Sequence, residues 1–140
     1  MNPDLELALA MADSADVTSM ARYRALDLQI ETKPDFTPVT EADRAVETAI
    51  RKTLSAERPA DGVIGEEFPN TNVAASRTWI IDPIDATKNY VRGVPVWGTL
   101  IALALDGEPV VGVVSAPAMG RRWWASPEDG AFTQDVDGSV

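Results

Sequence analysis

The chain has 140 residues and a formal net charge of −10, from 22 acidic and 12 basic residues. It contains no cysteine and no histidine, which excludes disulfides, thiolate nucleophiles, cysteine zinc sites and a Ser-His-Asp triad. Its chemistry must therefore use carboxylates, hydroxyls, amines, backbone groups or a metal bound through oxygen. The acidic excess disfavours nucleic acid as a partner and fits a divalent-cation site or a soluble surface.

Nothing in the sequence predicts a membrane partner. The longest nearly apolar stretch, from Val94 to Leu105, is far shorter than the roughly 20 residues that a membrane helix needs. The N-terminus lacks the positively charged start of a signal peptide. Because cysteine is absent as well, we expect a cytoplasmic protein.

The first third of the chain predicts a helix, a strand and a loop. Apolar residues on a 3.6-residue period predict an amphipathic helix over roughly Asp4 to Arg24. Leu26, Leu28 and Ile30 then alternate with polar residues, which is typical of a half-buried strand. Two prolines within 33–38 exclude a helix there and predict a loop.

A second helix is expected after this loop. Thr40 has the character of an N-cap, with Asp43 at the spacing of a capping box. The apolar stripe of this helix would consist of Ala42, Val46, Ala49, Ile50 and Thr53. Pro59 lies beyond its end.

After Gly62 the pattern changes to short apolar runs, which predict strands. Two of these runs are expected to form a hairpin buried on both faces, Leu100–Leu105 and Val110–Val114. The other predicted strands are Val63–Ile64, Trp79–Ile81, Arg122–Ala125 and Ala131–Thr133. The order of elements indicates an α+β fold with helices on one face of a largely antiparallel sheet.

The segment that follows Ile81 has the residues of a metal and phosphate site. Pro83 favours an extended conformation for Asp82, and Asp85 has the character of a cap for a short helix over 86–90. In that arrangement the free amides of Ala86 and Thr87 would bind a phosphate-like anion. Asp82 and Asp85 would hold Mg²⁺, which binds through one or two carboxylates and substrate phosphate. The alternative is a capped turn at a strand end.

Other polar and aromatic groups have structural interpretations. Glu66 and Glu67, taken alone, fit the place where a strand leaves the core better than a ligand site. Trp123 and Trp124 are adjacent in a strand, so one is expected in the core and one at the surface. Asp135–Ser139 has the pattern of a tight turn.

Three motifs in order resemble those of the inositol monophosphatase superfamily, which are Mg²⁺-dependent and lithium-sensitive phosphomonoesterases. Trp79–Tyr90 is similar to the first motif of that superfamily. Gly65–Glu67 matches its upstream glutamate motif, and Val39–Asp43 matches the segment leading into its second helix.

Further segments resemble bacterial histidinol-phosphate phosphatases within this superfamily, namely Val91–Trp97, Gly112–Pro117 and Arg121–Trp124. The implied activity is the hydrolysis of L-histidinol phosphate to L-histidinol and phosphate, a step of histidine biosynthesis. One alternative is a phosphatase of the same superfamily acting on inositol 1-phosphate or a related sugar or nucleotide phosphate. A second alternative is a non-catalytic acidic metal-binding fragment. The implied fold is the layered α/β/α/β/α sandwich of sugar phosphatases.

The resemblance implies a ligand set for two or three Mg²⁺ ions. Glu66, Asp82 and the carbonyl of Ile84 would bind one ion, and Asp82 and Asp85 would bind a second. Glu66 would also contact a third, more weakly held ion.

The resemblance also assigns catalytic and phosphate-binding roles. Glu66 and Thr87 would position and deprotonate a water on the metal, with Asp43 supporting Thr87. The amides of Ala86 and Thr87 would hold phosphate oxygens, together with Asp85. Lys33, in the loop before the second helix, is a further residue expected to approach the site.

The sequence departs from the family pattern in two respects. Alanine stands at position 86, where the family usually has glycine. Family members run to about twice this length, and a second motif with a further metal-binding aspartate is missing. We therefore expect residues 1–140 to be the N-terminal metal- and phosphate-binding part of such a domain, a poor catalyst alone and a homodimer as a full-length protein.

Overall fold

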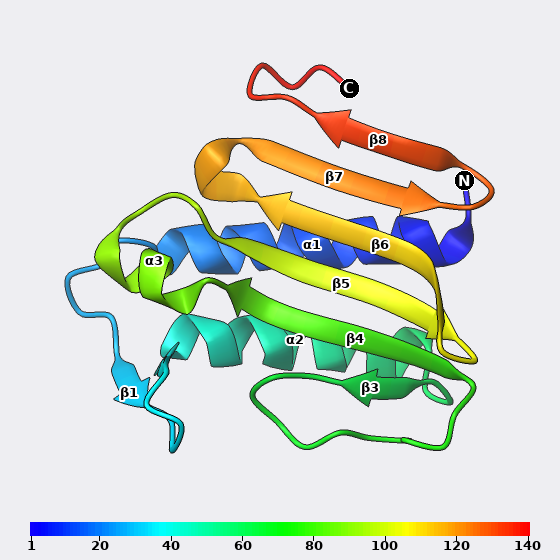
Figure 1. Cartoon of the computed structure of the whole chain (residues 1–140), viewed down its shortest axis with the longest axis horizontal. Coiled ribbons are helices and arrows are strands. Elements are labelled where there is room, and N and C mark those ends of the chain that lie inside the picture. The colour runs from blue at the N-terminus through cyan, green and yellow to red at the C-terminus, as the bar shows by residue number, and fades with distance from the viewer.

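The computed structural model describes all 140 residues, which form three helices and eight strands (Figure 1). The helices are α1 (Pro3–Arg22), α2 (Glu41–Glu57) and α3 (Thr87–Arg92), with one 3₁₀ turn at Pro117–Met119. The strands are β1 (Ile30–Thr32), β2 (Pro38–Thr40), β3 (Gly62–Ile64), β4 (Arg77–Asp85), β5 (Gly98–Leu105), β6 (Glu108–Ala116), β7 (Arg121–Ser126) and β8 (Gly130–Gln134). None of the helices combines the length and the apolarity needed to cross a membrane.

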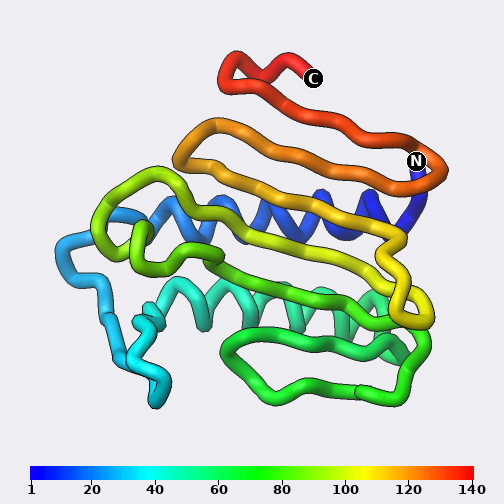
Figure 2. The backbone as a smooth tube through the Cα atoms, viewed as in Figure 1, coloured from blue at the N-terminus to red at the C-terminus, as the bar shows by residue number.

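One six-stranded sheet organises the molecule, with the strand order β3-β4-β5-β6-β7-β8. Strand β3 runs parallel to β4, and every other neighbouring pair is antiparallel. Helices α1 and α2 lie side by side on one face of this sheet, while β1 and β2 form a separate hairpin at its edge (Figures 1 and 2). The α+β architecture predicted from the sequence is confirmed.

The core lies between the two long helices and the sheet. The capping box predicted at the start of α2 is confirmed, because Oγ1 of Thr40 accepts from the amides of Ala42 and Asp43. Oδ2 of Asp43 in turn accepts from the amide of Thr40 at 2.9 Å. The cap fixes the start of α2, so its apolar stripe faces the sheet. The core residues are Leu5, Ala8, Met11, Ala12, Ala15, Val46, Ile50, Leu54, Val63, Trp79, Ile81, Ile101, Leu103, Val111 and Val113.

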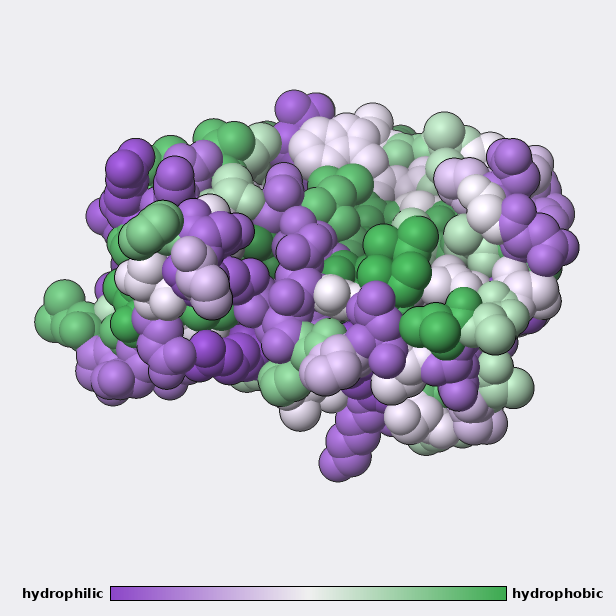
Figure 3. Space-filling model, turned by 60° about the horizontal axis from the view of Figure 1, so that its bottom comes forward, coloured by the Kyte–Doolittle hydropathy of each residue, from purple (hydrophilic) through white to green (hydrophobic).

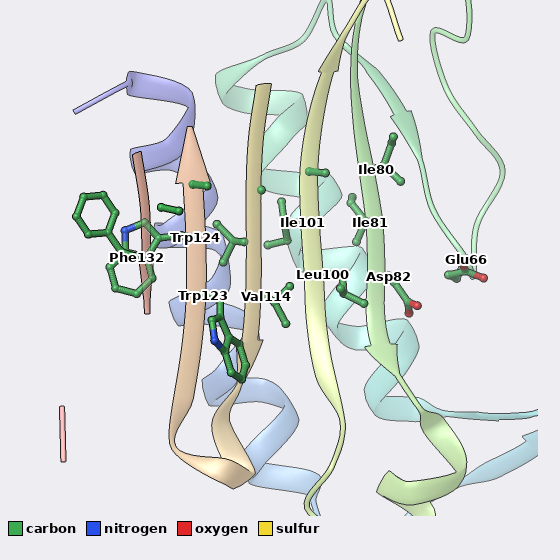
Figure 4. A pocket seen from close by; sticks show the side chains of 15 residues that line it. Glu66, Ile80, Ile81, Asp82, Leu100, Ile101, Val114, Trp123, Trp124 and Phe132 are labelled. Carbon is green, nitrogen blue, oxygen red and sulfur yellow. The ribbon is translucent and has the colours of Figure 1, made fainter. Parts of the chain in front are cut away.

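The other face of the sheet is open, so the prediction that β5 and β6 are buried on both faces is wrong. Ile101 and Val113 face the helices and are buried, whereas Leu100 and Val114 face the opposite side and are only half-buried. The helices cover one face alone, and no element of the chain covers the second. An apolar hollow of about 420 Å³ remains there (Figure 4), and Figure 3 shows apolar side chains exposed among polar ones.

The strand predicted over Leu26–Glu31 is wrong for its first four residues and confirmed only at Ile30 and Glu31, which belong to β1. Leu26 lies in a turn and is fully exposed, and strand pairing begins only at Ile30, opposite Thr40. Arg24 has a φ of 62°, which breaks the extended path before Leu26. Alternation alone does not make a strand when no neighbouring strand is present to accept its hydrogen bonds.

Two predictions near the C-terminus are confirmed. Trp124 packs against the core cluster, and Trp123 is 36% exposed on the open face. Asp135–Ser139 forms a turn, in which the amide of Gly138 donates to the carbonyl of Asp135 at 2.9 Å.

We expect Leu103→Ala to lower the free energy of unfolding by about 2–5 kcal/mol, because the removed side chain leaves a cavity in the packed core. Leu105→Ala is the matched control on the same strand, since Leu105 is 43% exposed, and its cost should stay below about 1 kcal/mol. Urea unfolding followed by tryptophan fluorescence measures both. Equal losses in the two variants would contradict the assignment of the core.

Candidate metal and phosphate site

A β-bulge at the end of β4 brings two aspartates to the same side of the sheet. Asp82 pairs with Leu100 and Asp85 pairs with Gly98, so β4 has one residue more than β5 between these two pairs. In a regular strand, side chains three residues apart point to opposite faces. The extra residue reverses this alternation, so both carboxylates lie on the open face of the sheet.

The bulge is held in place by its neighbours. The hydroxyl of Thr99 donates to the carbonyl of Pro83 at 2.9 Å, and both residues are buried. Proline has no amide N–H that would be left without a partner, so it fits a position where the hydrogen-bond ladder of the sheet is interrupted. Ile84 packs against Tyr90, Trp97 and Ala42 in a small second core. The backbone at the aspartates is therefore rigidly supported.

The neighbouring carboxylates disfavour the charge of Asp82. The pKa of Asp82 is raised to about 7 from its ordinary value of 3.8, mainly by burial and then by the charges of Asp85 and Glu66. Glu66 and Asp82 lie at the same end of the open hollow (Figure 4). A divalent cation would relieve this repulsion.

The donor set suits a hard cation in chemistry but is not closed into a cage. Carboxylate oxygens are the ligands that Mg²⁺ prefers, and Mg²⁺ commonly takes one or two from the protein. No group of three acidic side chains lies close enough to hold an ion together. The pair of Asp82 and Asp85 therefore fits a Mg²⁺ ion that completes its coordination with water or substrate.

Thr87 stands at the start of α3, where it contacts its predicted partner Asp43 and also Ile84. Its Oγ1 lies 3.0 Å from Oδ1 of Asp43 and 3.0 Å from the carbonyl oxygen of Ile84, either of which accepts its single proton. Asp43 is 1% exposed and uses its other oxygen in the cap of α2. The structure thus brings Asp43, Thr87 and Ile84 together. The carbonyl of Ile84 keeps a second lone pair for another partner.

The predicted cap by Asp85 is wrong. Asp85 is the last residue of β4, and Ala86 takes the N-cap position of α3 without a side-chain cap. Helix α3 begins at Thr87 and runs to Arg92 instead of covering 86–90. Ala86 has a φ of 68°, in the left-handed region, because the chain must turn sharply from the strand into the helix. This explains why glycine suits the position.

A residue that the sequence analysis missed holds the loop of Glu66. The buried carboxylate of Glu47 accepts from the backbone amides of Glu66, Glu67 and Phe68 at 2.9, 2.9 and 3.0 Å. Glu47 lies four residues after Asp43 on the same face of α2. The sequence signal that could have identified Glu47 is its position, as a charged residue inside the apolar stripe of a helix.

Two predicted site residues remain, Lys33 and Glu66. Lys33, in the hairpin between β1 and β2, donates to Oε1 of Glu67 at 3.0 Å, so it reaches the glutamate loop rather than the aspartates. Glu66 itself is exposed.

We expect the stability of the chain in EDTA to fall as pH rises from about 4 to 7 and to level off above pH 7. The folded pKa of Asp82, about 7, lies above the unfolded value of 3.8. Between these two pH values the folded state holds a proton that the unfolded chain has released, so stability falls until the carboxyl is ionised in both states. The loss should be on the order of 1 kcal/mol, because the side chain is only partly buried. Asp82→Asn removes this dependence. If the melting temperatures of the two proteins changed equally with pH over this range, the raised pKa of Asp82 would be refuted.

We expect Ala86→Gly to raise the free energy of unfolding by about 1 kcal/mol, since glycine adopts a positive φ without the steric penalty of a Cβ. Ala45→Gly is the control, because Ala45 is an exposed helical residue of α2 and the same change there costs about 1 kcal/mol. Thermal unfolding of both variants tests the difference in sign. A loss of stability at position 86 would mean that its backbone is unstrained.

The curated relatives of the chain include histidinol-phosphatases. The chain is 62% identical over 136 residues to a histidinol-phosphatase of Mycobacterium tuberculosis, covering 97% of this chain and 52% of that protein. It is also 62% identical to a histidinol-phosphatase of Streptomyces coelicolor, covering 93% of this chain and 50% of the relative. The chain thus spans about half the length of the curated relatives it matches.

Solved structures share the fold. The extragenic suppressor protein SuhB of Bartonella henselae matches with a TM-score of 0.86 at 30% identity, over 93% of this chain and 51% of that one. An IMPase of Thermotoga maritima matches with a TM-score of 0.85 at 31% identity, over 93% and 50%. The model of the inositol monophosphatase family matches residues 3–140. With that match extending over nearly every residue, the chain belongs to the inositol monophosphatase family.

Proposed function

We propose that the protein is a Mg²⁺-dependent phosphatase that hydrolyses L-histidinol phosphate to L-histidinol and phosphate, within histidine biosynthesis. Membership of the family supports a phosphomonoester as the substrate class. The names of the relatives at 62% identity support histidinol phosphate in particular. The observation that carries the proposal is the pair of aspartates at the bulge beside the contact between Thr87 and Asp43.

The carboxylates of Asp82 and Asp85 hold the cation in this proposal, with the carbonyl of Ile84 and Glu66 as further ligands for two or three ions. When bound, Mg²⁺ lowers the pKa of a coordinated water and stabilises negative charge on the phosphate. Glu66 can join them in this proposal, because its exposed side chain has no partner in the fold that would hold it elsewhere, while its backbone amide is held by Glu47.

Thr87 and Glu66 orient the attacking water and take its proton. Asp43 is placed to receive the proton of the Thr87 hydroxyl at 3.0 Å, which directs that proton away from the water and leaves the lone pairs of Oγ1 free to accept from it. Asp43 is fixed by the cap of α2, so the orientation of Thr87 is fixed as well. Such positioning matters because phosphoryl transfer depends largely on geometry and charge.

The phosphate would lie at the turn between β4 and α3. The backbone amides of Ala86 and Thr87 precede the first intrahelical hydrogen bonds and suit anionic oxygens. Residues 1–140 would thus form the metal- and phosphate-binding part of the domain. Recognition of the organic part of the substrate, dimerisation and a cytoplasmic location belong to the same proposal for the whole protein.

The decisive experiment measures phosphate release from L-histidinol phosphate with and without Mg²⁺, with inositol 1-phosphate as the competing substrate. It uses this chain and any longer product of the same gene. We expect preference for histidinol phosphate and loss of activity in EDTA. Preference for inositol 1-phosphate would overturn the substrate assignment, and no release from either would overturn the proposed enzyme activity.

Single substitutions test the residue roles in the active form. Asp85→Asn and Thr87→Ala should each lower kcat by at least about 100-fold, since one removes a ligand and the other the group that orients water. Asp106→Asn, in the exposed turn between β5 and β6, is the control and should leave kcat unchanged. Full activity of Asp85→Asn would contradict the metal assignment.

A further inference from the structure

The loop that follows β3 depends on one side chain of α2. Where residues 65–68 leave the sheet, three consecutive backbone amides act as donors, those of Glu66, Glu67 and Phe68. All three point at the carboxylate of Glu47, two at Oε1 and one at Oε2. The loop has no regular structure, so these amides lack any ladder or helix to satisfy them.

Burying the charged carboxylate of Glu47 costs desolvation free energy, which its hydrogen-bond donors offset. The residue is fully buried, and a charged group at such a place needs donors on every free lone pair. Arg51, one turn further along α2, donates from Nε to Oε2 at 2.9 Å and from Nη2 to the carbonyl of Phe68 at 3.1 Å. The carboxylate therefore has four donors, and the loop is tied to α2 through both its amides and a carbonyl.

Gly65 shows how closely the loop approaches. A Cβ at this position would lie 2.5 Å from Oε2 of Glu47 and 2.6 Å from its Cδ, far inside van der Waals contact. The glycine of the Gly65-Glu66-Glu67 motif is thus required by Glu47, not by the backbone torsion, because its φ is not in the positive range. Gly65 and the buried Glu47 therefore form one structural unit, in which the absence of a Cβ at position 65 leaves room for the carboxylate.

The position of Glu66 follows from this unit. Its own amide is one of the three held by Glu47, so its Cα is fixed although its side chain is exposed. Its carboxylate lies near enough to Asp82 for its charge to act on that group, at one end of the hollow in Figure 4. Loss of the anchor would let Glu66 move away from Asp82.

We propose that Glu47 is a positioning residue, which sets the affinity of the cation site by fixing the loop that carries Glu66. This rests on the proposed function in one respect, the assignment of Glu66 as a cation ligand. Glu47 has no oxygen left for a cation, since its carboxylate is occupied by backbone amides and Arg51. It acts only through the backbone.

The test compares Glu47→Gln with the native chain. Glutamine keeps the size of the side chain but replaces one acceptor oxygen by a donor, so at least one amide of the loop loses its partner. Glu57→Gln is the matched control, because Glu57 is an exposed glutamate at the end of the same helix. Amide hydrogen exchange and a Mg²⁺ titration, both followed by NMR on the 140-residue chain, are the two readouts.

In Glu47→Gln we expect exchange of the amides of residues 66–68 to be about tenfold faster and the Mg²⁺ concentration for half-saturation to be about tenfold higher. Gly65→Ala should give the same two changes from the loop side, because its Cβ displaces the Glu47 carboxylate. If Glu47→Gln fails to fold, Gly65→Ala still decides the question. In an active form, saturating Mg²⁺ should restore most of kcat, which a merely structural defect would not allow.

Two results separate failure of this proposal from failure of the proposed function. Faster loop exchange with unchanged Mg²⁺ affinity in Glu47→Gln, while Glu66→Gln weakens Mg²⁺, would overturn the role of Glu47 alone. Unchanged Mg²⁺ affinity in Glu66→Gln would overturn Glu66 as a ligand, and with it the route by which Glu47 acts.

Discussion

The extra residue of β4 opposite β5 is the constraint on which the site depends. Without it, Asp82 and Asp85 would lie on opposite faces of the sheet, and one would be forced into the core beside Ile81. With it, both carboxylates lie on the open face. Ala86, in the left-handed backbone conformation, then turns the chain from β4 into α3. The fold thus accepts a strained Ala86 and a pair of repelling charges at one place, as is common where a protein binds a ligand.

Helix α2 supplies the second support. Its first turns present two buried carboxylates on one face, Asp43 and Glu47, among the apolar residues that pack on the sheet. Each carboxylate is satisfied by groups from a different segment: Asp43 by Thr40 and Thr87, Glu47 by the loop after β3 and by Arg51. The helix therefore sets the separation between α3 and the glutamate loop, and hence between the groups that flank the aspartates.

Much of the fold could be predicted from local pattern. The two long helices, the capping box at Thr40 and the strands β3 to β8 follow from periodicity and from the residues that end each run. The errors arose where a partner decides the outcome. Leu26–Ile30 alternates as a strand does but has too little neighbouring strand, and β5 and β6 are apolar on both faces although the helices cover only one. Asp85 has the chemistry of a cap, but the bulge makes it part of the strand.

The sequence by itself determined the kinds of groups available: oxygen donors without cysteine or histidine, placed after apolar runs in an order that resembles one enzyme family. Only the tertiary structure decided which of them meet. The contact between Thr87 and Asp43 joins residues 44 positions apart, and Glu47 reaches amides about 20 positions away. Pairing across such distances is set by how the helix packs on the sheet and by the register of the strands, and neither is contained in the local pattern of residues.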